Sequence, residues 1–186
     1  MPTNSRRKGA NYELEVGKQL RSWAEAALRN LKLDPKDWFC RAPLSGGWNR
    51  THAEGEDLLL PKGCNISIEC KKREAWTFSA LLRGVATKTQ VWGFWDEALG
   101  RIPKGRDLVL IFSQNREDDW VLLELGLWIS LKATADDVVD ETAITRGADT
   151  FVLMTLATFM EKASPDYFLA PSNGPRCAHV DLPLVT

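Results

Sequence analysis

The fold of this chain is decided by residues 55–71, which read Gly55-Glu56-Asp57-Leu58-Leu59-Leu60-Pro61-Lys62-Gly63-Cys64-Asn65-Ile66-Ser67-Ile68-Glu69-Cys70-Lys71. The apolar residues 58–60 precede a Pro-Lys-Gly sequence that favours chain reversal. Residues 66–71 then alternate, which places Glu69 and Lys71 on one face of a strand, roughly 7 Å apart. We therefore predict a β-hairpin centred on Gly63.

This hairpin would bring two carboxylates together. Asp57 and Glu69 are equally distant from Gly63 in the sequence, so they would oppose each other with Cβ atoms about 5 Å apart. Carboxylates at that separation repel each other unless a cation lies between them. Mg²⁺ prefers oxygen ligands and often uses one or two carboxylates together with water and substrate phosphate. On its own, however, a Glu-x-Lys pattern also fits an ordinary exposed strand face.

A third carboxylate lies on the first predicted helix, from about Asn11 to Leu31, with Asn11 as the expected N-cap. Glu13 lies at the end of the apolar stripe of this helix, whereas Glu15 points away from it. Because charged groups rarely lie beside an apolar face without a partner, Glu13 is a candidate ligand. The alternative is a glutamate that interacts with the helix dipole. The stripe consists of Val16, Leu20, Trp23, Ala24, Ala27 and Leu31.

Four motifs in this order resemble the PD-(D/E)xK nuclease superfamily, and within it the Holliday junction resolvases of archaeal and bacteriophage type. The resemblance covers about Arg6 to Leu125. It implies an α/β fold with a restriction-endonuclease-like core, in which helices flank a central mixed β-sheet. The motifs are Lys8-Gly9-Ala10-Asn11-Tyr12-Glu13, Arg41-Ala42-Pro43-Leu44-Ser45-Gly46-Gly47-Trp48, Asp57, and Ile68-Glu69-Cys70-Lys71.

The resemblance also implies a set of site residues. Those matching the family's catalytic positions are Glu13, Asp57, Glu69, Lys71 and, for its functional serine, Ser45. Those expected to hold a metal are Asp57, Glu69, the carbonyl of Cys70, and Glu13. Glu56 stands where the family often has a proline before the aspartate, and Glu54 and Glu56 remain minor alternatives to Asp57.

The implied activity is Mg²⁺-dependent hydrolysis of DNA phosphodiesters, with Mn²⁺ as a possible substitute. The expected substrate is a four-way junction, cut by paired nicks, and a two-fold homodimer suits that symmetry. Three alternatives stay open: a restriction or repair endonuclease of the same superfamily, a DNA-binding protein of nuclease fold that does not cleave, and an unrelated protein with chance motifs. The sequence contains no Gly-rich phosphate loop, so ATP is not expected.

Charge is unevenly distributed along the chain. Residues 1–90 contain 16 Lys and Arg against 10 Asp and Glu, whereas residues 91–186 contain 8 against 15. Because the basic half contains every motif above, we expect it to bind phosphates, although a solvated charged surface is the alternative. The candidate DNA-binding residues are Arg6, Arg7, Lys8, Arg41, Ser45, Trp48, Lys72, Arg73 and Gln90. Trp76 is a further candidate for stacking on bases.

Length and composition fit one nuclease domain over residues 1–163, with a motif-bearing core at 6–125 and a C-terminal elaboration at 126–163. Residues 164–186 contain four prolines and are expected to form an extended or mobile tail. No apolar run suits a membrane span or a secretory leader, so an intracellular protein is expected. The other predicted elements are a helical region at 76–99 interrupted near Gly84, strands at 107–112, 120–125 and 151–155, and a helix at 156–162.

Overall fold

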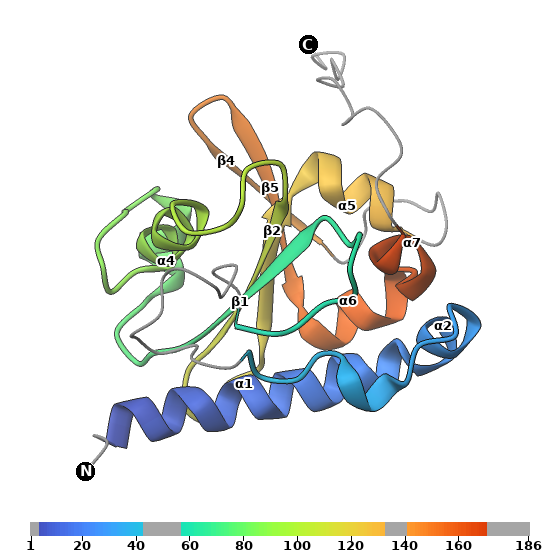
Figure 1. Cartoon of the computed structure of the whole chain (residues 1–186). Coiled ribbons are helices and arrows are strands. Elements are labelled where there is room, and N and C mark those ends of the chain that lie inside the picture. The colour runs from blue at the N-terminus through green and yellow to red at the C-terminus, as the bar shows by residue number, and fades with distance from the viewer. Residues whose placement is uncertain (1–3, 43–56, 133–140, 171–186) are drawn as a thin grey trace.

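The computed structural model describes residues 4–42, 57–132 and 141–170, with side chains from Arg7 onward (Figure 1). Within these ranges no helix combines the length and apolar character needed to cross a membrane. The elements are α1 (Asn4–Trp23), α2 (Glu25–Asn30), the 3₁₀ helix η1 (Pro35–Asp37), β1 (Ile66–Lys72), α3 (Phe78–Leu82), α4 (Val91–Leu99), β2 (Asp107–Ser113), β3 (Trp120–Glu124), α5 (Leu125–Leu131), β4 (Thr142–Arg146), β5 (Asp149–Thr155), α6 (Leu156–Lys162) and α7 (Pro165–Leu169).

The strands form a mixed sheet in the order β1-β2-β3-β5-β4. β1 and β2 are parallel, with Glu69 opposite Leu110, and the other neighbouring strands are antiparallel. A parallel pair requires a crossover connection, which α3 and α4 supply here. β1 is therefore an edge strand, and its free side is open to the segment that carries Asp57.

Alternation along the strands buries both faces of the sheet. Ile68 and Cys70 belong to a core shared with α1, α2, α5, α6 and α7, whereas Leu110 and Phe112 belong to a second core shared with α3 and α4. Figure 1 shows α1 and α4 on opposite sides of the sheet. The predicted α/β class, with a mixed sheet flanked by helices, is confirmed.

The first helix begins at Asn4, so the prediction of Asn11 as its N-cap is wrong; Asn11 is an exposed residue within α1. The polar residues before Tyr12 do not contribute to the apolar stripe, and for that reason the stripe alone underestimates the length of the helix at its N-terminal end. A turn at Ala24 separates α1 from α2. Leu31, predicted as part of the stripe, is exposed after the end of α2.

The predicted hairpin is correct at its turn and wrong in its first strand. Gly63 has φ 95°, and the Cys64 N–H donates to the Pro61 carbonyl over 3.1 Å. Residues 57–60, however, form no strand. The Leu59 N–H donates to Cys40 and the Asp57 carbonyl accepts from Ala42, so these backbone groups are already paired with residues 39–42 and cannot form a ladder with β1.

The later elements agree with prediction at β2, β3, β5 and α6, whereas α5 and β4 were not predicted. The helical region at 76–99 divides into α3 and α4, with a longer break than expected near Gly84. The expected tail does not begin at Ser164, because Ser164 caps α7, Pro165 occupies its first turn, and Phe168 is buried. Residues 171–186 of that tail lie outside the described residues.

Candidate metal and nucleic-acid site

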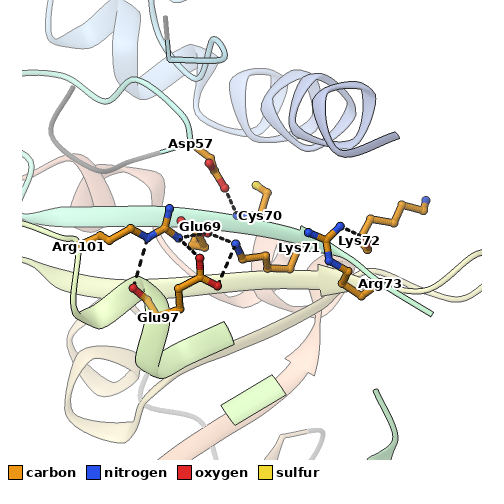
Figure 2. A network of polar contacts seen from close by, with 8 residues as sticks. All are labelled: Asp57, Glu69, Cys70, Lys71, Lys72, Arg73, Glu97 and Arg101. Carbon is orange, nitrogen blue, oxygen red and sulfur yellow. Dashed lines mark hydrogen bonds and ion pairs between the residues drawn. The ribbon is translucent and has the colours of Figure 1, made fainter. Parts of the chain in front are cut away.

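Asp57 and Glu69 meet at the free edge of β1. The Asp57 N–H donates to the Ile68 carbonyl over 3.1 Å, and the Asp57 Oδ2 accepts the Cys70 N–H over 2.8 Å (Figure 2). These two bonds hold the aspartate on either side of the position from which Glu69 projects. The sequence prediction that these carboxylates converge is supported by this geometry, although the expected strand pairing does not produce it.

Burial, together with repulsion from neighbouring carboxylates, raises the pKa of Asp57 to about 7. Burial is the largest cause, followed by the charge of Glu69, and Glu13 adds to the rise. The Cys70 N–H and the charge of Lys71 act in the opposite direction. Additional positive charge nearby would therefore stabilise the ionised form of Asp57.

Glu13 lies on the other face of the sheet, and its charge acts on Asp57. It lies on α1, is 8% exposed, and pairs through Oε2 with the Arg41 Nε over 2.5 Å. The prediction that Glu13 lies at the buried edge of its helix, while Glu15 is exposed, is confirmed. Arg41, a candidate for DNA binding, here contacts Glu13.

Glu69 is the most deeply buried acid of the site, with 2% of its side chain exposed. Its Oε1 atom accepts from the Lys71 Nζ over 2.7 Å and from the Arg101 Nη2 over 2.5 Å. Figure 2 shows these two cations approaching Glu69 from opposite sides. Glu97 lies 3.8 Å from each of them. Lys71 is therefore placed beside Glu69 as its strand spacing predicts.

Arg101 and Glu97 were not predicted from the sequence. Their spacing of four residues indicates a helical ion pair, which is a common surface feature and does not identify a site. The crossover after β1 places the end of α4 over the face on which Glu69 lies. Arg101 and Glu97 could have been identified from the sequence only if it also indicated that this helix packs on that face of β1.

The donor set fits a hard divalent cation. Asp57 and Glu69 supply carboxylate oxygens, and the Glu69 Oε2 atom is buried without a hydrogen-bond partner among the described residues. Because the N–H and C=O of a strand residue point to the same side, the Cys70 carbonyl faces the edge that carries Asp57. In the part of the chain that is described, no three His, Cys, Asp or Glu side chains form a ready metal cluster. Arg101 and Lys71 supply positive charge at Glu69 instead.

Three of the predicted basic residues line a pocket of about 380 Å³ beside the end of β1. They are Arg7, Lys8 and Lys72, and Asn11, Tyr12, Glu15 and Asn115 complete the pocket. The Lys72 Nζ lies 5.0 Å from the centre of the Tyr12 ring. Lys8 pairs with Glu74. This pocket offers cationic and amide groups of the kind that bind phosphate.

The remaining candidates differ in their surroundings. Arg73 is exposed, and its Nη1 donates to the Lys72 carbonyl over 3.3 Å. The Gln90 amide bridges backbone groups, donating to the Ala75 carbonyl and accepting from the Thr77 N–H. Trp76 is buried between aromatic rings, so the prediction that it stacks on bases is wrong. The Arg6 side chain, Ser45 and Trp48 lie outside the described residues.

Comparison with known protein families identifies one that matches most of the chain. A family model described as "Phage putative PDDEXK endonuclease" matches residues 4–170. The chain belongs to this family. No curated protein and no solved structure was found to match it.

Membership of the PDDEXK endonuclease family confirms the superfamily resemblance and implies a hydrolase that acts on DNA. Divalent cations are typical of such enzymes, in agreement with the acidic donor set at β1. The match also extends well past Leu125, where the motif resemblance ended, and includes α7. The predicted C-terminal elaboration is therefore part of the region that the family shares.

Proposed function

We propose that this chain is a divalent-cation-dependent DNA endonuclease whose active site is the acidic cluster at the free edge of β1. The observation that carries the proposal is the pairing of Asp57, with its pKa near 7, and Glu69, with its unpartnered Oε2. Asp57 and Glu69 would hold Mg²⁺, or Mn²⁺ in its place. The Cys70 carbonyl and Glu13 would contribute directly or through water.

A bound divalent cation supplies a water of lowered pKa and neutralises charge on the phosphate. Lys71 has two tasks in this proposal. Its ammonium, 2.7 Å from Glu69, orients that carboxylate, and it is near enough to hold the attacking water by hydrogen bonding. Asp57 is fixed by the Cys70 N–H, so it is oriented before substrate arrives.

DNA would lie across the basic pocket at the end of β1. Arg7, Lys8 and Lys72 are proposed to contact backbone phosphates, and Arg73 extends the same surface. Such contacts position the duplex without reading its sequence. The other proposed DNA-binding residues are Arg6, Arg41, Ser45, Trp48 and Gln90, with Ser45 also retained as a catalytic candidate.

The proposed substrate is a four-way junction, on the strength of the motif order that resembles junction resolvases. Two symmetric nicks require two active sites related by a two-fold axis, so a homodimer is part of this proposal. A restriction or repair endonuclease of the same family would use the same cluster on linear duplex. A non-cleaving DNA-binding protein would retain the basic pocket alone.

A cleavage assay tests these proposals. Labelled four-way junctions and matched linear duplexes are incubated with the wild type, Asp57→Asn or Glu69→Gln, in Mg²⁺ or EDTA. We expect paired nicks near the branch point, with at least about 10²-fold loss of rate in either variant. Glu25→Gln is the matched control, because Glu25 is an exposed helical glutamate paired with Arg29.

Each outcome has a definite meaning. Equal cutting of linear duplex would refute junction specificity and retain the endonuclease. Binding without cutting in Mg²⁺ or Mn²⁺ would refute catalysis. Cleavage that survives both substitutions would refute the assignment of this cluster as the active site.

A further inference from the structure

Arg101 occupies the position in which the candidate site needs positive charge. Its Nη2 lies 2.5 Å from the Glu69 Oε1, the shortest contact that this carboxylate makes among the described residues. The charges of Glu69, Glu97 and Asp57 all raise the pKa of Arg101 against the lowering effect of its burial. One guanidinium is thus attracted to both carboxylates that a divalent cation would share.

The Arg101 guanidinium is held by contacts at the end of α4, and its side chain is partly exposed to solvent. Arg101 lies two residues beyond the end of α4, its N–H donates to the Ala98 carbonyl over 2.8 Å, and its Nε donates to the Glu97 carbonyl over 3.3 Å. Its side chain is 42% exposed, whereas that of Glu69 is 2% exposed. The guanidinium can therefore leave Glu69 by rotation of an exposed side chain, without unpacking the sheet.

An alternative acceptor is already beside it. Glu97 is 58% exposed, and its carboxylate lies 3.8 Å from both Arg101 and Lys71. Glu97 lies in the last turn of α4 and Arg101 in the turn that follows, four residues later in the sequence. Arg101 would consequently keep an ionic partner after leaving Glu69.

We propose that Arg101 is a resident cation that neutralises Glu69 in the metal-free protein and is exchanged for a divalent cation, so that Arg101 sets the metal affinity of the site. This inference rests on the proposed function. Lys71 and Arg101 already share the Glu69 Oε1 atom, so a divalent ion at the same buried carboxylate would bring a third cation and repel both. Arg101 is the one that leaves, because its side chain is 42% exposed and that of Lys71 only 14%. After exchange, Glu97 holds the arginine at the mouth of the site. Arg101 is thus a positioning residue that acts through Glu69.

The test measures metal affinity without DNA. Binding of Mg²⁺ and of Ca²⁺ is followed by calorimetry for the wild type, Arg101→Met and Arg101→Lys. Removing the charge but keeping the length of the side chain should tighten binding about tenfold, the effect of about 1.4 kcal/mol. Arg101→Lys should stay near the wild type. Arg83→Met is the control, because the Arg83 Nε makes the same kind of bond to the carbonyl four residues earlier, at Ser79.

Glu97→Gln gives a second, opposite effect. Without the alternative acceptor, Arg101 should hold Glu69 more persistently, so metal binding should weaken about threefold or more. In an Arg101→Met background the same change should have no effect, because Glu97 acts through the arginine. A merely structural role of these residues would not produce opposite signs. In EDTA, Arg101→Met should also melt at a lower temperature than the wild type, because Glu69 loses a partner.

Metal affinity that is unchanged or weaker in a folded Arg101→Met protein overturns the exchange. Weakening by Glu97→Gln that persists in the Arg101→Met background also overturns it, because Glu97 would then act on the metal directly. If the wild type cleaves DNA with Mg²⁺ while these affinities stay equal, the exchange fails and the proposed function stands. If the wild type neither binds metal nor cleaves, both fail together.

Discussion

Gly17 is the point at which α1 crosses the segment that supports the candidate site. A Cβ atom at this position would lie 2.2 Å from the Phe39 carbonyl oxygen and 3.3 Å from the Leu58 Cδ2. Real Cβ atoms essentially never approach within 3.0 Å of such atoms, so α1 and the Phe39 backbone must separate by about 0.8 Å or more. Phe39 has φ 52°, a conformation that leaves its backbone little freedom to adjust.

The effect of Gly17→Ala follows from two opposing terms. Alanine in a helix interior stabilises the folded protein by about 1 kcal/mol relative to glycine. Forcing packed groups apart costs about 1–3 kcal/mol, and because the clash here involves a backbone carbonyl rather than a flexible side chain, we expect the upper part of that range, about 2–3 kcal/mol. We expect a net loss of about 1–2 kcal/mol, or about 2–8 °C in Tm for a chain of this size.

Gly126 provides the matched control, since it is also helical and nothing lies within 4 Å of a Cβ placed there. Gly126→Ala should raise stability by up to about 1 kcal/mol. Thermal and urea unfolding followed by circular dichroism would measure both variants. Gly17→Ala should also slow cleavage, because the Ala42 N–H bonded to the Asp57 carbonyl moves with the Phe39 segment. A Gly17→Ala protein as stable as the wild type would refute this reasoning.

Two further predictions concern stability away from the site. Arg146 donates two hydrogen bonds to Asp96, at 2.6 and 2.8 Å, and these lower the pKa of that carboxyl. The pair therefore stabilises the fold at neutral pH, and this contribution is lost as pH falls below about 3.8. Asp96→Asn should therefore cost less than about 1 kcal/mol at pH 7, because the pair is partly exposed, and the difference from the wild type should vanish in acid; a constant difference across pH would argue against the pair. Phe168→Ala should cost about 3–5 kcal/mol in urea unfolding, because this ring is 1% exposed and packs against Trp23 and Phe159, and a loss below about 1 kcal/mol would contradict the role of α7 in closing the core.

Local pattern was sufficient wherever the physical cause was local. The alternation of residues 66–71 predicted which face carries Glu69 and Lys71, because side-chain direction in a strand depends on the backbone alone. Asp57 lies only a short chain distance from Glu69, so the turn at Gly63 was enough to predict their approach. The helical spacing around Val16 likewise predicted the burial of Glu13.

Long-range packing decided the rest. Arg101 and Glu97 reach Glu69 because a parallel crossover lays α4 over one face of β1, and no pattern within α4 reports which strand it will cover. Trp76 is buried between Phe78, its near neighbour in the sequence, and Phe112 of β2, and the contact with Phe112 depends on the tertiary fold. The prolines after Ser164 favoured a tail, but Phe168 packs into the core against Trp23 of α1 and Phe159 of α6. Sequence by itself determined the acidic pair and its lysine, since these arise from one turn and one strand. Only the tertiary structure decided that Arg101 joins Lys71 at Glu69, because packing, and not neighbouring sequence, brings the end of α4 to the site.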